Sequence, residues 1–267
     1  MKSTYRLLLL PVAIFFMAFW LLPVSRLLIL PAEQDWRLYF VFLTEARYAW
    51  SLINTLGLSI SVTLVTLILG AAVGLYLGRQ QFPGRQLLLS ILTLPLSFPG
   101  VIIGFFMILL AGRQGLVTDI TQALGLGRFS FAYGLAGLFL AYLYFSLPRA
   151  IAAYAAAAQS MDKSVEEAAR SLGARRWHII RDVWMVQLEP TTSACAAIVF
   201  ATSMGAFGTA FTLSSQFEVL PITIYSEFTN FANFTLAASL SITLGLFTWF
   251  ALFLTRRQEI VTGVASQ

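Results

Sequence analysis

Few side chains in this 267-residue chain could do covalent chemistry, and they are not placed for it. The one histidine is His178, outside the long apolar stretches, and the one cysteine, Cys195, can form no disulfide within the chain. All twelve acids also lie outside those stretches, which excludes a nucleophile–base or aspartyl pair within the membrane. The phosphate loop G-x-x-x-x-G-K-[ST] is missing. We therefore expect no catalytic residue, metal site or cofactor site here.

The most informative polar segment is 164–177, which reads SVEEAARSLGARRW. Ser164, with Glu167 three residues later, predicts a capping box that satisfies two amides at a helix start. Gly173 suits the left-handed conformation that ends a helix. The sequence therefore predicts a short, hydrophilic helix between Ser164 and Gly173, about 12 Å long at 1.5 Å per residue.

A second helix is predicted to start near Ala174. Its apolar residues recur at helical spacing and are Trp177, Ile180, Trp184 and Leu188. Its charged residues would face water and are Arg175, Arg176, Arg181 and Asp182. Such an amphipathic helix would lie on a membrane surface, with its tryptophans at the level of the lipid headgroups.

The elements that must hold this segment are apolar. Hydrophobic residues make up 58% of the chain and charged residues 11%, whereas charged residues are about a quarter of a soluble domain. A transmembrane helix needs about 20 mostly apolar residues. Six uncharged stretches of this size occur, at 7–25, 48–78, 86–112, 129–148, 190–217 and 228–255. We expect an all-α, polytopic membrane protein with six transmembrane helices.

The distribution of Lys and Arg predicts that both termini lie on the cytoplasmic side. With that orientation, twelve of the 17 cations fall on the inside and five on the outside. The net charge of +5 then reflects topology, and no basic run with aromatics suggests a nucleic-acid partner. Lys2 and Arg6 could mimic a secretory signal, but no A-x-A cleavage pattern follows Leu22. We expect an uncleaved first helix.

Two of the six stretches carry features of helices in a packed interior. Gly70, Gly74 and Gly78 are four residues apart, so they lie on one face and favour close helix packing. Pro95 and Pro99 predict a bent or broken third helix, which is tolerated in a membrane only where protein or a water-filled cavity surrounds it. The third helix is expected to line the interior, with a purely structural kink as the alternative.

The short polar helix resembles part of a known family. Glu167-Ala168-Ala169, three residues, Gly173, nine residues and the apolar Val183 are similar to the signature loop of permease subunits of binding-protein-dependent ABC importers. In that family the loop precedes the last two transmembrane helices, and here it falls between the fourth and fifth apolar stretches. Small side chains at Ala168 and Ala169 would let the surface of another protein come close.

The resemblance covers about residues 48–257 and departs from the family at one point. The family continues with Leu-Pro, where this chain has Met185-Val186, and a later proline recurs as Pro190. The implied fold is that of type I importers. It divides the chain into a first transmembrane helix with an outer loop (1–47) and a five-helix permease core (48–267), with a cytoplasmic coupling loop at 151–189.

The resemblance also implies partners and a mechanism. The docking residues would be Glu167, Ala168, Ala169 and Gly173. They would bind a separate ABC ATPase dimer, which holds ATP and Mg²⁺ and moves the short helix as a lever. The spans would then open a cavity alternately to outside and inside. Further partners are a second permease subunit, related or identical, and a soluble periplasmic or lipid-anchored binding protein. The location implied is the bacterial inner membrane.

Two segments bear on the identity of the cargo. Residues 94–100 and 203–208 look like parts of the third and fifth spans of permeases for polyamines, organophosphonates, thiamine, ferric iron and oxyanions. We expect a polyamine-like or organophosphonate cargo. The candidate pathway residues are Ser97, Pro99, Ser203 and Thr209. Interhelical hydrogen bonds or helix kinks are the alternative role for each.

Two further hypotheses concern the outer side and the class of transporter. Glu218 and Glu227 flank 220–226, a segment that could meet the binding protein. An ion-coupled secondary transporter is the main rival, but such carriers commonly use acids within the membrane, which this sequence lacks. A purely structural membrane protein would leave the glycine-ended polar helix unexplained. ATP dependence of uptake separates these classes.

Overall fold

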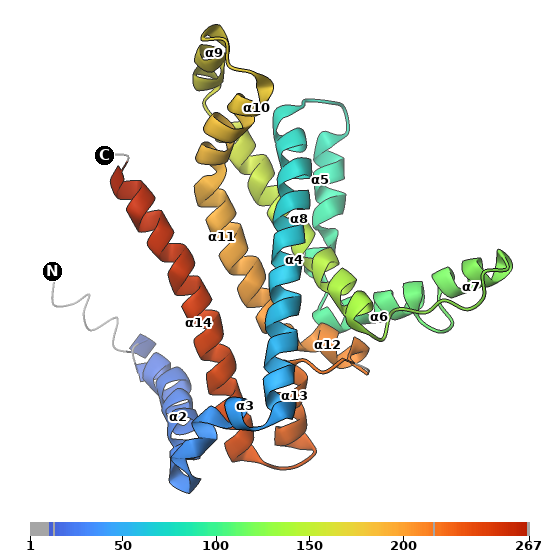
Figure 1. The fold of residues 1–267 in the computed structure, drawn as a ribbon, viewed down its shortest axis with the longest axis vertical. Coiled ribbons are helices and arrows are strands. Elements are labelled where there is room, and N and C mark those ends of the chain that lie inside the picture. The colour runs from blue at the N-terminus through green and yellow to red at the C-terminus, as the bar shows by residue number, and fades with distance from the viewer. Residues whose placement is uncertain (1–10, 13, 216, 266–267) are drawn as a thin grey trace. The chain divides into compact units, whose positions relative to one another are not determined.

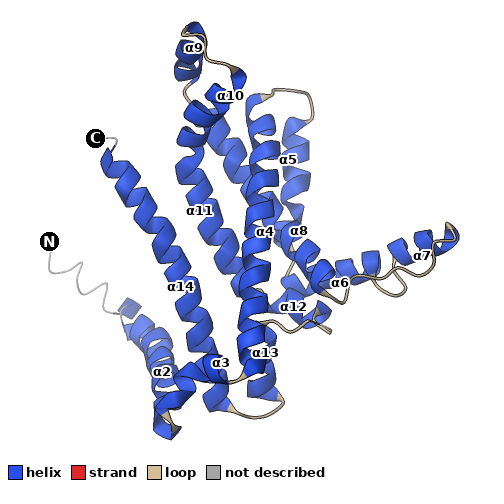
Figure 2. Cartoon of the chain, in the orientation of Figure 1, coloured by secondary structure: helices blue, strands red, loops and turns tan. Residues whose placement is uncertain are grey.

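The computed structural model describes residues 11–265 except 13 and 216, with side chains described as far as residue 255. Every regular element in this part of the chain is helical, which confirms the all-α prediction (Figure 2). In chain order the elements, with η for 3-10 or π turns, are η1 (Met17–Leu21), α2 (Leu22–Gln34), η2 (Trp36–Phe40), α3 (Val41–Thr44), α4 (Ala46–Arg79), α5 (Arg85–Thr93), η3 (Leu94–Ser97), α6 (Gly100–Ala111), α7 (Leu116–Ala123), α8 (Leu135–Ser160), α9 (Lys163–Ser171), α10 (Arg176–His178), η4 (Ile179–Trp184), α11 (Met185–Met204), α12 (Phe207–Leu213), α13 (Leu220–Thr229) and α14 (Phe234–Ala265).

Six helical stretches of the described chain are long and apolar enough to cross a membrane, as predicted. They are Ile14–Gln34, Ala46–Arg79, Gly100–Ala123, Leu135–Ser160, Arg176–Met204 and Phe234–Thr255. The bounds of several differ from those of the uncharged stretches predicted from the sequence. A helix can contain charged residues near its ends when their long side chains reach polar surroundings. The fifth stretch begins at Arg176 rather than at Pro190, so the segment between the fourth and fifth stretches is only 161–175.

The described residues form two compact units. One comprises the described part of Met1–Ile53 with Leu220–Phe247, and the other comprises Asn54–Val219 with the described part of Thr248–Gln267. In the first unit the carboxylate of Glu227 in α13 accepts a hydrogen bond from Tyr48 at 3.1 Å and lies 3.5 Å from Arg47. These contacts tie the start of α4 to α13.

In the second unit, α4 packs closely against α8 (Figure 1). A Cβ added to Gly74 would lie 2.5 Å from the Tyr154 Cβ and 2.8 Å from the Ile151 carbonyl oxygen. A Cβ on Gly70 or Gly78 would lie within 2.7 Å of an alanine Cβ on α8. The prediction that the three glycines permit close packing is therefore confirmed, and α8 is the helix that they contact.

The third apolar stretch is broken, as its prolines predict. Helix α5 ends at Thr93, η3 follows, and α6 begins only at Gly100, after Pro99. The predicted span 86–112 is thus two helices, and the candidate membrane-crossing stretch is formed by α6 with α7. Helix α6 packs against α12, where the Thr209 hydroxyl donates a hydrogen bond to the Gly100 carbonyl at 3.0 Å.

Candidate functional site

The short polar helix exists, but its first residue and its cap differ from the prediction. Helix α9 begins at Lys163, and the Asp162 carboxylate accepts a hydrogen bond from the Ser164 backbone N–H at 2.8 Å. Ser164 is therefore inside the helix, and the predicted Ser164–Glu167 capping box is wrong. The hydrogen bonds from Ser164 lower the pKa of Asp162. A carboxylate at this end also suits the positive pole of the helix dipole.

The end of α9 confirms the predicted role of Gly173. This residue has φ +83°, a left-handed conformation that glycine adopts without steric cost. Its N–H donates to the Arg170 carbonyl at 2.9 Å, and the Ala174 N–H donates to the Ala169 carbonyl at 3.0 Å. These two bonds form a Schellman motif, which satisfies carbonyls at the helix end. Helix α9 is therefore a defined nine-residue element with a cap at each end.

The outward face of α9 is open and partly apolar. Leu172, just after the helix, is 89% exposed and Val165 is 46% exposed. Glu167 and Ala168 are exposed as well, whereas Ala169 is half-buried. Three of the four predicted docking residues, with Gly173 among them, thus lie on the accessible side of this short helix. A surface of this size and composition suits a groove on another protein.

The inward face of α9 is held by Glu166, which is 7% exposed. One carboxylate oxygen accepts a hydrogen bond from Arg79 at 2.6 Å and from the Trp184 indole N–H at 3.1 Å. The other oxygen accepts from Arg170 at 2.7 Å. The Arg79 guanidinium also lies over the Trp184 ring, 4.1 Å from its centroid. We call Glu166, Arg79, Trp184 and Arg170 the Glu166 cluster.

The electrostatics of the Glu166 cluster favour the carboxylate form. Burial by itself would raise the pKa of Glu166, but the hydrogen bonds from Arg79, Trp184 and Arg170 and the positive charge of Arg79 outweigh it. The pKa of Glu166 is therefore lowered from its ordinary value. Charge-assisted hydrogen bonds of this kind are shorter and stronger than neutral ones. The cluster joins α9 to the end of α4 and to η4.

The predicted amphipathic surface helix is wrong. Residues Arg176–Met204 form one helical run of 29 residues, so the segment after Gly173 is the start of the fifth candidate span. The buried residues at its start are Ile179, Val183 and Leu188, whereas Trp177 is 65% exposed. The α-helical spacing predicted the buried Leu188 correctly, but the buried residues before it are Ile179 and Val183 instead of Ile180 and Trp184, in a segment that forms a π turn. The Trp184 ring contacts Arg79, and its indole N–H donates to Glu166.

Sequence reasoning missed Glu166, Arg79 and Trp184 as site residues. One signal was readable, since Glu166 and Arg170 are four residues apart on a helix and can pair. The contact between Glu166 and Arg79 joins residues 87 positions apart, and no local pattern predicts it.

The pathway candidates fall into two groups. Ser203 and Thr209 line one pocket of about 490 Å³, to which Gly100, Tyr142 and Ser146 also contribute. Ser97 and Pro99 are exposed and do not line it. Within the described structure the buried Ser203 hydroxyl has no hydrogen-bond partner, whereas the Thr209 hydroxyl is engaged with the Gly100 carbonyl.

The same pocket lies at a helix break. Helix α11 ends at Met204 and α12 begins at Phe207, so the predicted span 190–217 is interrupted. The carbonyl of Ala206, within the break, accepts a hydrogen bond from the Tyr142 hydroxyl at 2.8 Å. Non-helical backbone at membrane depth needs such a partner, or a cavity that holds water. The break and the pocket therefore belong together.

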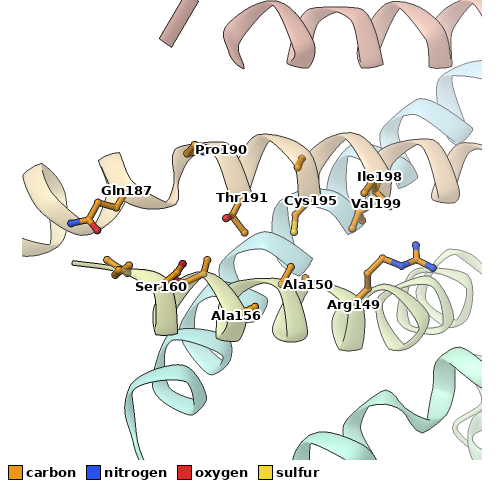
Figure 3. A pocket seen from close by; sticks show the side chains of 14 residues that line it. Arg149, Ala150, Ala156, Ser160, Gln187, Pro190, Thr191, Cys195, Ile198 and Val199 are labelled. Carbon is orange, nitrogen blue, oxygen red and sulfur yellow. The ribbon is translucent and has the colours of Figure 1, made fainter. Parts of the chain in front are cut away.

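A second cavity of about 670 Å³ lies between α8 and α11 (Figure 3). Small residues such as Ala150 and Ala156 line its α8 wall, and Cys195 points into it from α11. Arg149 lies at one end, and Ser160 and Gln187 lie at the other, next to the segment that carries α9. Among the described residues no group of three or more His, Cys, Asp or Glu could hold a metal ion.

Glu218 and Glu227, the two acids that flank the segment 220–226, differ in their contacts. Glu227 is 4% exposed, and its carboxylate is engaged with Arg47 and Tyr48. Glu227 therefore holds the start of α4 to α13 within the first unit. The backbone carbonyl of Glu218 accepts a hydrogen bond from the Asn54 side chain at 3.1 Å.

Acidification is expected to loosen α9. Because the folded-state pKa of Glu166 is lowered, its stabilising contribution is full above the unfolded-state pKa and is lost as the pH falls through the folded-state value. A nitroxide on Leu172→Cys, in a Cys195→Ala background, should become more mobile over that pH range. Its electron paramagnetic resonance spectrum reports this directly.

The variant Glu166→Gln has no carboxyl to titrate at this position and serves as the control. The nitroxide should then be mobile at every pH, without an acid step. A step that persists in Glu166→Gln would contradict the assignment to Glu166. It would point to the cap residue Asp162, whose pKa is also lowered.

Comparison with known proteins gives consistent relatives. The family model described as "Binding-protein-dependent transport system inner membrane component" matches residues 70–259. The chain is 31% identical over 164 residues to the molybdenum transport system permease protein ModB of Escherichia coli (strain K12), covering 60% of this chain and 70% of ModB. It is 28% identical over 196 residues to the thiamine transport system permease protein ThiP of the same strain, covering 72% of this chain and 36% of ThiP.

Solved structures share the fold. A chain of a bacterial alginate ABC transporter, in complex with an alginate pentasaccharide-bound periplasmic protein, matches with a TM-score of 0.82 at 19% identity, covering 95% of this chain and 93% of that one. A chain of the MetNI methionine ABC transporter in an inward-facing conformation matches with a TM-score of 0.58 at 18% identity, covering 82% and 99%. At these identities the likeness concerns the fold alone.

Proposed function

This chain belongs to the family of binding-protein-dependent transport system inner membrane components, and from that membership we propose that it forms half of a solute pathway and couples it to a separate ATPase through α9. Members of this family are multi-pass inner-membrane permease components of ABC importers. The observation that carries the proposal is α9 itself, which is capped at both ends and exposes Glu167, Ala168 and Leu172. A solvated connecting loop would need none of these features.

The proposed partners supply what this chain lacks. An ATPase dimer would bind ATP and Mg²⁺, since the sequence has no phosphate loop of its own. Its groove would receive Glu167, Ala168, Ala169 and Gly173. A second permease subunit, related or identical, would complete the pathway, and a binding protein on the outer side would deliver the cargo.

The proposed orientation places α9 and both termini in the cytoplasm. The support is the excess of Lys and Arg on that side, and Lys163, Arg170, Arg175 and Arg176 all lie in or beside α9. An ATPase fuelled by cytoplasmic ATP requires α9 on the same side.

We favour a small oxyanion as the cargo over the polyamine-like or organophosphonate solute expected from the sequence. The relatives are named for molybdenum, thiamine and sulfate transport, the last being CysT of Escherichia coli (strain K12), 27% identical over 190 residues that cover 70% of this chain and 67% of CysT. Ser203 is the favoured pathway residue because its buried hydroxyl lines the pocket at the α11–α12 break. Thr209 remains a candidate for shaping that break, and Ser97 and Pro99 remain candidates for shaping the break between α5 and α6.

Co-purification tests the proposal. The tagged protein, extracted gently in detergent, is expected to carry an ABC ATPase that mass spectrometry identifies. Glu167→Lys reverses a charge on the exposed face of α9 and should weaken the complex, whereas Asp182→Lys, at an exposed acid beyond α9, should leave it intact.

Transport by the purified complex distinguishes an ATP-driven importer from an ion-coupled carrier. ATP-dependent uptake of molybdate or sulfate into vesicles, with the binding protein present, would support both the function and the cargo. Uptake that proceeds without an ATPase and follows an ion gradient would contradict the importer and favour an ion-coupled carrier.

A further inference from the structure

We propose that Glu166 is a positioning residue that makes α9 move as one body with α4 and α11 when the ATPase moves. This inference rests on the proposed function, because it concerns how the docked helix transmits movement. Glu167 and Ala168 face outward, toward the ATPase, and Glu166 faces inward. Docking and transmission are therefore assigned to neighbouring residues that point in different directions from one helix.

The two ends of α9 do not fix its direction by themselves. At its start, Met161 and Asp162 are extended, and at its end Gly173 is in the left-handed conformation. Such junctions can change their dihedral angles at small cost, as hinge positions do. A helix joined only through Met161–Asp162 and Gly173 could turn under load without moving α8 or α11.

Glu166 removes that freedom through a contact distant in sequence. Both of its oxygens are used, one by Arg79 and Trp184 and the other by Arg170, so the side chain is held in one orientation. Arg79 is the last residue of α4, a continuous helix of 34 residues. A displacement of α9 therefore reaches the end of α4 through an ion pair of 2.6 Å.

The position of the Arg79 side chain depends in turn on Glu166. The Arg79 side chain is 21% exposed, and within the described structure its buried Nε has no hydrogen-bond partner. Its guanidinium contacts both the Trp184 ring and the Glu166 carboxylate. Beside Arg79, Gly78 packs against Ala158, so the end of α4 is also fixed to α8. The cluster thus links α9 to α4, α8 and the start of the fifth span.

The proposal predicts a separation of two properties. Removing the carboxylate leaves the outward face of α9 unchanged, so the ATPase should still bind and hydrolyse ATP. The loss should be in transmission, with α9 moving while α4 stays. Docking residues such as Glu167 should show the opposite pattern, with loss of the ATPase itself.

Spin-label distances in the complex test this directly. Nitroxides are placed on Lys163→Cys, at the exposed start of α9 and away from its docking residues, and Leu64→Cys, 56% exposed on α4, in a Cys195→Ala background. The complex is measured without nucleotide and after trapping with ATP and vanadate. In the parent the distance between the labels should be the same in both states. In Glu166→Gln the distance should differ between the two states.

The control is Asp182→Asn, which removes a carboxylate of the same segment from an exposed pair with Arg181. It should behave like the parent, with ATPase activity close to the parent value in all variants. An unchanged distance in Glu166→Gln after trapping, or an equal shift in Asp182→Asn, would overturn the proposal.

A second variant keeps the test decisive if Glu166→Gln does not assemble. Trp184→Phe keeps an aromatic ring at this position and removes the indole N–H that donates to Glu166, so a smaller shift of the same sign is expected. No shift in this variant would then count against the proposal. A parent that binds no ATPase would instead contradict the proposed function, which distinguishes the two failures.

Discussion

Gly173→Pro is expected to release the ATPase from the complex. Proline holds φ near −65° and has no N–H, whereas Gly173 has φ +83° and donates to the Arg170 carbonyl. Both bonds that end α9 would be lost, and the exposed Leu172 would change direction. We expect the affinity for the ATPase to fall about tenfold or more. A tenfold loss corresponds to about 1.4 kcal/mol of binding free energy. Binding of the purified ATPase to immobilised permease measures it.

A matched control exists in the same chain. Gly125, after α7, has φ +75° and donates to the Gln122 carbonyl at 3.1 Å, and a Cβ added there would have no atom within 4 Å. Gly125→Pro therefore imposes the same backbone conflict away from α9, and ATPase affinity should stay at the wild-type value. Equal losses in both variants would mean that general misfolding, not the end of α9, controls the binding.

Gly74→Ala is expected to destabilise the packing of α4 on α8. The added Cβ would lie 2.5 Å from the Tyr154 Cβ and 2.8 Å from the Ile151 carbonyl, and backbone atoms cannot rotate away. Overpacking of this kind costs about 1–3 kcal/mol, and we expect the upper end. Heating should expose Cys195, which is 6% exposed, at a clearly lower temperature, as read by a thiol-reactive dye in detergent.

Gly57→Ala is the comparison for this prediction. Gly57 lies in the same helix, and a Cβ there would have no atom within 4 Å. Its unfolding temperature should equal or slightly exceed that of the wild type, because alanine favours a helix over glycine by about 1 kcal/mol. If Gly74→Ala also unfolds at the wild-type temperature, α4 and α8 can separate without loss, and the glycines have no packing role.

The interior was the most predictable part, because each inference there rested on one residue type with a strong backbone preference. Proline at 95 and 99 cannot continue a helix, and glycine at 70, 74 and 78 creates a flat face, so the break and the close packing followed from the sequence. The bounds of the spans were less predictable. Arg149 and Arg176 lie within helices, although the uncharged stretches predicted from the sequence excluded both residues.

The cap and the inward face of α9 were not predictable from the local sequence. Asp162 and Ser164 are both good caps, and only the observed start at Lys163 decides between them. Glu166 and Glu167 are adjacent and chemically alike, yet one is buried against Arg79 and the other is exposed. Which carboxylate turns inward depends on where α4 ends, and that is a property of the tertiary fold.

The π turn at Ile179–Trp184 has a consequence for the length of the chain. The buried residues around it are separated by four and then five positions, from Ile179 to Val183 and on to Leu188. In an α-helix a step of five turns the side chain about 140° beyond a full revolution, and a π turn takes up the extra residue. We therefore expect that one residue can be removed from this segment while Glu166 and Cys195, on either side of it, keep their neighbours.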